Sequence, residues 1–285
     1  MLEEIQNKIN LIYGVDPMNP LSIAFIGAGK MATAIAAGLA KNMSEAQVRA
    51  FDISEKAAAD FTKATSYACS TADAAGVIAA ADVVILAVKP QYAENALTSL
   101  AGALAGKLLI SIVAGWKIER LSALAKDARV IRVMPNTPAL SGEGMSCFSA
   151  GCNATEQDSL IAEKILSSVG RVRCVNENLL DAVTGLSGSG PAYVMEFIMG
   201  LADGGVFCGL PRDAALELAI QTVLGTAVMC RENPAAIAAL RDAVISPGGT
   251  TACGIRVLQE GAFKGLTAHA VIAGAEKSAD LGKKQ

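Results

Sequence analysis

The sequence contains little that would support metal or disulfide chemistry. Among its 285 residues there is one histidine, and the seven cysteines include no Cys-x-x-Cys pair. A single histidine excludes a site built from several histidines, and scattered cysteines in odd number do not form a disulfide framework. We therefore expect no metal site, and we expect the cysteines to be small buried side chains in a reducing cytoplasm.

Long apolar runs and an excess of charge of either sign are also missing. The apolar runs, such as residues 83–88, are shorter than the roughly 20 residues of a membrane span. The 24 basic and 27 acidic residues give a net charge of −3, with no basic footprint for nucleic acid. Aromatic residues make up only 4% against 52% hydrophobic residues, which favours layers packed from small apolar side chains. These features indicate a cytoplasmic globular protein without a membrane or nucleic-acid partner.

The chain divides into a short extension and two domains. Residues 1–20 begin with acidic side chains and lack the apolar block of a secretory signal, and Met18 within them is a candidate internal start. Residues 21–176 alternate apolar strands with helices, which predicts a Rossmann-type parallel sheet in an α/β domain. Residues 177–285 carry helical stripes only, which predicts an all-α domain for dimerisation and substrate binding. The expected strands are 21–27, 47–53, 81–90, 107–115 and 128–135, with 143–151 and 170–177 as edge candidates.

A dinucleotide-binding fingerprint follows the first predicted strand and opens a predicted helix. In such a turn the first glycine allows the tight bend, and the second lets the backbone approach a pyrophosphate. The last small residue lets the helix pack on the strand, with its N-terminus facing the negative charge. The predicted cofactor contacts here are Gly27, Ala28, Gly29, Lys30, Met31 and Ala32.

Asp52 ends the second predicted strand, at the distance along the chain where an acidic residue binds the adenosine ribose. A carboxylate at this position repels a 2′-phosphate and favours NADH. Ser54 and Lys56 follow closely and offer contacts that suit NADPH. The sequence therefore leaves both cofactors open.

The remaining residues allow two kinds of reduction. Reduction of a ketone needs a placed acid, for which Lys89 and Tyr193 are the candidates, because His269 is poorly placed in a helical pattern. Reduction of a C=N bond needs less, since a protonated imine is already electrophilic. The lack of an obvious acid favours an imine substrate. The alternatives are a β-hydroxyacid dehydrogenase-like reductase with Lys89 as its acid, and a protein that binds NAD(P) without catalysis.

Two segments rich in Gly, Ser and Thr precede predicted helices in the second half. Residues 246–251 (SPGGTT) and 185–193 (GLSGSGPAY) would leave unpaired main-chain N–H groups at a helix start. Such groups bind anions, so residues 246–251 form a candidate site for a substrate carboxylate. Ordinary interhelical loops are the alternative interpretation.

The order and spacing of five segments resemble the pyrroline-5-carboxylate reductase family, from about residue 21 to the C-terminus. The resemblance implies reduction of 1-pyrroline-5-carboxylate to L-proline by NADPH or NADH. It also implies a homodimer with interlocked helical domains, and dimers that build larger rings, commonly decamers. The segments are AVKP at 87–90, VMPNTPALSGEG at 133–144, DAVTGLSGSGPAY at 181–193, ADGGVFCGLPRDAA at 202–215 and SPGGTT at 246–251.

The resemblance also implies roles for individual residues. It places the substrate carboxylate against the backbone of Gly249, Thr250 and Thr251, with Ser246 and Glu177 nearby. It gives the Thr251 hydroxyl the catalytic contact with the ring nitrogen. Since the helical domains interlock, the substrate loop of one subunit is expected to approach the nicotinamide with help from the partner's helices. Beyond Asp52, the implied cofactor contacts are Ala87, Val88, Lys89, Pro90, Val113, Ala114 and Asn136.

Overall fold

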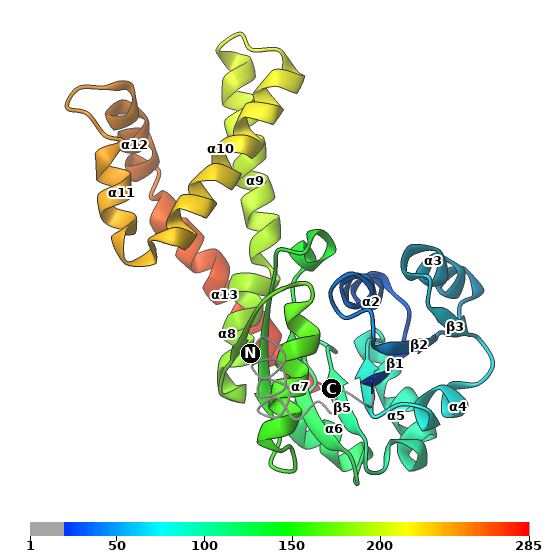
Figure 1. Cartoon of the computed structure of the whole chain (residues 1–285). Coiled ribbons are helices and arrows are strands. Elements are labelled where there is room, and N and C mark those ends of the chain that lie inside the picture. The colour runs from blue at the N-terminus through cyan, green and yellow to red at the C-terminus, as the bar shows by residue number, and fades with distance from the viewer. Residues whose placement is uncertain (1–19, 285) are drawn as a thin grey trace, which may run out of the picture. The chain divides into compact units, whose positions relative to one another are not determined.

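The computed structural model describes residues 20–284, so the predicted N-terminal extension, all but its last residue, lies outside the described residues. The described chain forms two compact units (Figure 1). The sheet unit contains the residues up to Gly188 and those from Gly274 onward. The helical unit contains residues 189–273.

The sheet unit is built on an eight-stranded sheet with the order β3-β2-β1-β4-β5-β6-β7-β8. Neighbouring strands pair in parallel except β6 and β7, which confirms the predicted Rossmann-type architecture. The sequence analysis missed β3, because three residues are too short to show a strand pattern. The strands are β1 (Ser22–Ile26), β2 (Gln47–Phe51), β3 (Ala68–Ser70), β4 (Val83–Leu86), β5 (Leu108–Ser111), β6 (Arg129–Met134), β7 (Gly144–Ala150) and β8 (Gly170–Cys174).

Helices cover both faces of this sheet, which explains why its central strands are apolar throughout. Ile23 and Phe25 of β1 pack in one hydrophobic cluster, with residues of α2, α3 and α7. Ala24 and Ile26, which point to the other face, pack with residues of α4, α5 and α6. These helices are α2 (Lys30–Asn42), α3 (Glu55–Thr65), α4 (Ala74–Ala79), α5 (Pro90–Leu104), α6 (Ile118–Leu124) and α7 (Glu156–Ser167).

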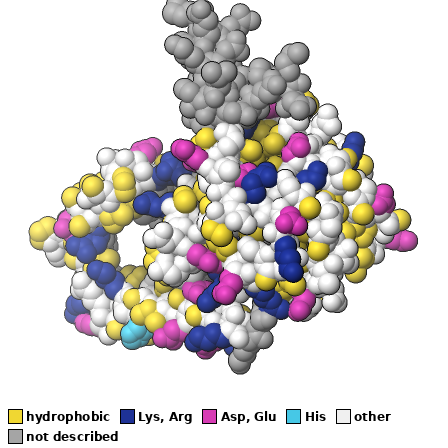
Figure 2. Space-filling model, turned by 90° about the horizontal axis from the view of Figure 1, so that it is seen from below, with side chains coloured by type: hydrophobic (Ala, Val, Ile, Leu, Met, Phe, Trp, Pro, Cys, Tyr) yellow, Lys and Arg dark blue, Asp and Glu magenta, His cyan; other side chains and the backbone are white. Residues whose placement is uncertain are grey.

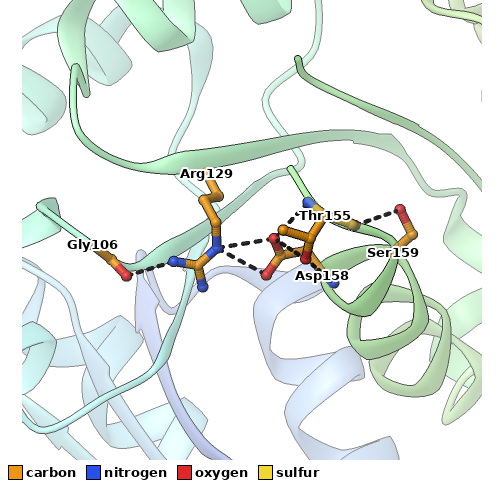
Figure 3. A network of polar contacts seen from close by, with 5 residues as sticks. All are labelled: Gly106, Arg129, Thr155, Asp158 and Ser159. Carbon is orange, nitrogen blue, oxygen red and sulfur yellow. Dashed lines mark hydrogen bonds and ion pairs between the residues drawn. The ribbon is translucent and has the colours of Figure 1, made fainter. Parts of the chain in front are cut away.

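A buried carboxylate ties α7 to the sheet (Figure 3). Asp158, only 2% exposed, accepts the N–H and the hydroxyl of Thr155 and so closes a capping box at the start of α7. Both Asp158 oxygens also accept from Arg129 Nε, at 3.0 and 2.9 Å. Arg129 Nη1 donates in turn to the Gly106 carbonyl at 2.7 Å. The Asp158–Arg129 pair therefore joins a helix start, a strand and the loop before β5.

Replacing the Asp158 carboxylate tests how much it contributes to the free energy of unfolding. Asp158→Asn should lower the free energy of unfolding by about 2 kcal/mol, because charge-assisted hydrogen bonds become neutral ones. Arg129 is 35% exposed, so solvent screening keeps the ion-pair part of that loss small. Denaturant unfolding measures the change, with exposed Asp127→Asn as the matched control. Equal midpoints for the two variants would show that the network does not stabilise the unit.

Residues 177–188 belong to the sheet unit, so the predicted domain boundary at 176/177 does not coincide with the boundary between the compact units. Asn136 Nδ2, at the end of β6, donates to the Ser187 carbonyl at 3.1 Å. Ser278 Oγ, near the C-terminus, donates to Asp181 Oδ1 at 2.7 Å. These long-range contacts have no local sequence signal. The segments here are a turn at Glu177–Leu179, α8 (Leu180–Val183) and a π-helical turn at Thr184–Gly188.

The helical unit buries little of its own apolar surface. Its buried hydrophobic cluster contains only Ala202, Ala215 and Ala219, whereas Phe207 is 93% exposed. Hydrophobic side chains also reach the surface on the face of the molecule in Figure 2. A unit with so small a core needs a covering partner. Its helices are α9 (Gly190–Phe207), α10 (Arg212–Glu232), α11 (Ile237–Ala243), α12 (Thr250–Glu260) and α13 (Phe263–Lys284), whose last turns belong to the sheet unit.

Among the described helices, α10 is long and apolar enough to cross a membrane by length and composition. The length of uninterrupted apolar runs in the sequence did not reveal α10, because small and polar residues interrupt its apolar residues. Leu216, Ile220 and Leu224 are exposed at helical spacing, and Leu218 and Met229 are exposed on the opposite side of α10.

The cysteines depart from the expectation of burial. All seven are free, and only Cys147 is buried. Burial raises the pKa of the Cys147 thiol, while Arg173 opposes the shift. Burial, reinforced by the Asp52 carboxylate, also raises the pKa of Cys69. Cys152, Cys174, Cys208 and Cys253 are exposed.

Candidate active site

The first glycine of the fingerprint brings two strand-to-helix turns together. The Gly27 N–H donates to the Phe51 carbonyl at 2.8 Å, and the Gly27 φ angle is +97°. A Cβ on Gly27 would lie 2.7 Å from the Ala87 carbonyl oxygen. Only glycine therefore allows the turn after β1 to approach the turn after β4 this closely.

The start of α2 presents main-chain N–H groups that its own helix does not pair. Gly29 is the N-cap and supplies no side-chain acceptor, and the Thr33 N–H is bonded to the Gly29 carbonyl at 2.9 Å. The N–H groups of residues 30–32 precede that first helical bond. A Cβ on Gly29 would meet nothing within 4 Å, so the space above this helix end is open. Ala32 packs fully buried beneath it. This arrangement fits a pyrophosphate.

Asp52 closes the turn from the neighbouring strand. Its Oδ2 accepts the Ala28 N–H and its Oδ1 accepts the Ser54 N–H, both at 2.8 Å. The carboxylate is therefore fixed by two main-chain donors, while its remaining lone pairs are free of these bonds. Ser54 itself caps α3 by accepting the Ala57 N–H. This geometry suits the hydroxyls of an adenosine ribose.

A cavity of about 740 Å³ lies at these turns and joins most of the predicted cofactor segments. It opens where β1, β2 and β4 end, the edge at which parallel α/β sheets bind ligands. Its lining combines the fingerprint, the end of β2 and the AVKP segment. The predicted residues among the lining are Gly27, Gly29, Asp52, Ala87, Val88 and Lys89; Pro90 follows as the first residue of α5.

The lining also contains residues that the sequence analysis did not name. Tyr92, Asn95, Ala96 and Ser99 of α5 face the cavity. Their spacing of three and four residues is that of one helix face. This helical spacing directly after AVKP is the sequence signal that could have identified these residues as part of the cavity.

The predicted contacts after β5 and β6 lie outside this lining. The Val113 N–H donates to Ser111 Oγ at 3.3 Å, and Ala114 follows in the same turn. Asn136 Oδ1 accepts the Met145 N–H at 2.8 Å, in addition to the bond from its amide to Ser187. The Asn136 side chain therefore joins strand ends to the GLSGSG segment.

The predicted substrate loop forms the start of α12 in the helical unit. Gly248 has a φ of +68°, and the Gly249 N–H donates to the Ser246 carbonyl at 3.0 Å. Gly249 is the N-cap and no side chain caps α12. The N–H groups of Thr250 and Thr251 precede the first helical bond, from Cys253 to Gly249. The same geometry that suits a phosphate at α2 suits a carboxylate here.

Glu177, the other predicted substrate residue, lies in the sheet unit and is engaged there. Its Oε1 accepts the Ile118 N–H at 2.7 Å, at the start of α6. The same oxygen accepts from Arg132 Nη1 at 3.1 Å. Glu177 therefore contacts Ile118 and Arg132, which the resemblance does not imply.

Two protein-family models match the chain. The model described as pyrroline-5-carboxylate reductase dimerisation matches residues 177–281. The model described as NADP oxidoreductase, coenzyme F420-dependent, matches residues 22–115. The first model indicates that the chain forms a homodimer, in agreement with the exposed apolar surface of the helical unit.

Similar proteins cover nearly the whole chain. The pyrroline-5-carboxylate reductase of Glycine max is 42% identical over 271 residues, 93% of this chain and 97% of that protein. The one of Synechocystis sp. is 43% identical over 267 residues, 93% of this chain and 99% of that protein. The crystal structure of Plasmodium falciparum pyrroline carboxylate reductase with NADP bound has a TM-score of 0.83 at 32% identity, covering 92% of this chain and 98% of that one.

Fold and site together define an NAD(P)-dependent oxidoreductase with a helical dimerisation domain. The glycine-rich turn, the carboxylate of Asp52 after β2 and the glycine N-cap of α2 are the features that define this class. The chain belongs to the pyrroline-5-carboxylate reductase family.

Gly29→Ala tests the pyrophosphate site without disturbing the fold. The added methyl meets no protein atom within 4 Å and occupies the open space above α2. Thermal unfolding should stay near that of the wild type, while the dissociation constant for NADPH should rise about tenfold or more, a loss of about 1.4 kcal/mol. Gly102→Ala, also free of contacts within 4 Å, is the control. Unchanged NADPH affinity in Gly29→Ala would remove this helix start from the cofactor site.

Proposed function

We propose that this protein reduces 1-pyrroline-5-carboxylate to L-proline by hydride transfer from NADPH or NADH. Membership in the family supports the reaction. The observation that carries the site assignment is the uncapped start of α12 after the left-handed Gly248.

The loop would bind the substrate carboxylate through main-chain donors. The N–H groups of Thr250 and Thr251, with the Gly249 N-cap beside them, offer a carboxylate the positive end of a helix. Ser246 adds a hydroxyl so close to Gly249 that a Cβ on Gly249 would collide with it. The chain therefore supplies orientation and charge complementarity rather than a nucleophile.

The Thr251 hydroxyl would hydrogen-bond the ring nitrogen. The bound nicotinamide supplies the hydride, which goes to the imine carbon. The nitrogen keeps the proton of the iminium form and becomes the amine of proline. A strong acid is not required, because the protonated imine is already electrophilic.

The cofactor would lie along the glycine-rich turn and the AVKP segment. Lys30, Met31 and Ala32 would offer N–H groups to the pyrophosphate, and Val113, Ala114 and Asn136 would lie toward the nicotinamide. The cavity at the ends of β1, β2 and β4 supports this placement.

The reaction is tested by adding pyrroline-5-carboxylate to the protein with NADPH or NADH. The loss of cofactor absorbance measures cofactor consumption, and proline is then identified as the product. A β-hydroxyacid dehydrogenase-like reductase would instead oxidise a 3-hydroxy acid and would lose turnover in Lys89→Met. A protein that only binds NAD(P) would consume neither substrate.

Thr251→Ala should lower kcat and leave NADPH affinity near that of the wild type. Loss of one hydrogen bond to a charged group corresponds to about 1.5–3 kcal/mol in kcat/KM. Thr251→Ser keeps the hydroxyl and is expected to recover most of the activity. Steady-state kinetics with both substrates varied measure the effect. Wild-type kinetics in the alanine variant would exclude Thr251 from the mechanism.

Asp52→Ala should shift the preference toward NADPH. The variant removes the charge that repels a 2′-phosphate and the acceptor that binds the ribose hydroxyls. The ratio of kcat/KM for NADPH to that for NADH is measured in both proteins. A ratio that does not change would show that Asp52 does not contact the ribose.

Beyond the homodimer, we propose the larger assembly that the family resemblance implies. The helical units would interlock, so that the partner's helices complete the substrate site, and dimers would join into a decamer. We also propose a cytoplasmic location, which the seven free cysteines favour. Light scattering of the purified protein distinguishes a dimer from a decamer.

A further inference from the structure

The turn between β5 and α6 is fixed by a side chain from far along the chain. This turn, residues 112–117, carries the proposed nicotinamide contacts Val113 and Ala114. The α6 helix that ends the turn has no cap from its own N-cap residue, Lys117. Instead Glu177 Oε1 accepts the Ile118 N–H at 2.7 Å.

The Glu177 carboxylate is itself held by a buried arginine. Arg132 projects from β6, and its side chain is only 7% exposed, against 30% for Glu177. Arg132 Nη1 lies 3.1 Å from the oxygen that accepts the Ile118 N–H. Because a buried guanidinium keeps its charge, removing the carboxylate would leave that charge uncompensated. The pair therefore fixes one defined position of the Glu177 oxygen.

Two more contacts restrain the same turn. A Cβ on Gly282 of α13 would lie 3.2 Å from the Gly115 carbonyl oxygen, so the end of α13 lies against the turn. Trp116 is 2% exposed in the core, and the Arg120 guanidinium stacks 3.9 Å from its ring centroid. The turn is thus held from the core side by Trp116 and from outside by Glu177 and α13.

We propose that Glu177, held by Arg132, is a positioning residue for the cofactor that acts through the 112–117 turn, rather than a contact of the substrate. Its carboxylate sets where Val113 and Ala114 lie and therefore how the nicotinamide faces the imine carbon. This inference rests on the proposed function, and it offers an alternative to the substrate role that the resemblance implies for Glu177. It also links the cofactor site to the first residue of the dimerisation region.

The test uses variants that separate the hydrogen bond from the charge. Glu177→Gln keeps an acceptor for Ile118 but loses the ion pair, Glu177→Ala loses both, and Arg132→Met removes the buried cation. Glu45→Gln is the control, because Glu45 is an exposed carboxylate, 60% accessible, in the same unit. Circular dichroism and the dimer mass establish that each variant is folded.

Kinetics of the full-length enzyme give the first readout. Glu177→Ala should raise the KM for NADPH and lower kcat by about tenfold to 100-fold, since a displacement of about 1 Å costs about 100-fold. Glu177→Gln should lie between the wild type and Glu177→Ala. The double variant Arg132→Met/Glu177→Gln should be no worse than the worse single variant, because paired residues are not additive.

The fluorescence of Trp116 gives a second readout in the variants that circular dichroism shows to be folded. It is the only tryptophan of the sequence, so its emission reports on this turn alone. Glu177→Ala should shift the emission and weaken its quenching by NADPH, whereas Glu45→Gln should match the wild type.

A higher KM for pyrroline-5-carboxylate alone, with NADPH kinetics and Trp116 emission unchanged, would overturn the proposal and make Glu177 a substrate residue. Wild-type behaviour of Glu177→Ala in all measurements would overturn it as well. If Arg132→Met does not fold, Glu177→Gln still decides between these outcomes. NADPH binding and Trp116 emission need no substrate, so this test stays distinct from the failure of the proposed reaction.

Discussion

Main-chain N–H groups at the two helix starts whose N-cap is a glycine, those of α2 and α12, connect this fold to its proposed chemistry. Ser54, Asp73 and Thr155 cap α3, α4 and α7 with their own side chains, and Glu177 serves α6 from a distance. At α2 and α12 the N-cap is a glycine without a side-chain acceptor. The helices α5, α9, α10 and α11 also lack a side-chain cap, but their N-caps are not glycines. The uncapped ends of α2 and α12 can accept an anion from solution because the protein does not fill them.

The two helix starts belong to different units. The helical unit, which carries the α12 loop, has a core of three alanines and many exposed apolar side chains. Such a unit gains most of its stability from a partner subunit. Under the proposed function, the α12 loop would gain stability on dimerisation, and the 112–117 turn would depend on Glu177, the first residue of the region matched by the dimerisation model.

Local patterns were sufficient to predict the sheet, its main helices and the glycine-rich turn. Apolar strands buried on both faces and a fingerprint with small residues at fixed spacing are local signals. The strand β3 is too short to show a strand pattern. The face of α5 that lines the cavity has a regular helical spacing and could have been predicted. The partners of Glu177 and Asn136 were not predictable, because Arg132, Ile118 and Ser187 lie far from them in sequence and carry no periodic signal.

A crystal structure of the dimer with NADP and proline tests the central claim most directly. The account predicts that a proline carboxylate oxygen lies about 3 Å from the N–H groups of Thr250 and Thr251. It also predicts that the pyrophosphate lies at the start of α2. Proline bound elsewhere, with the 246–251 loop empty, would contradict it.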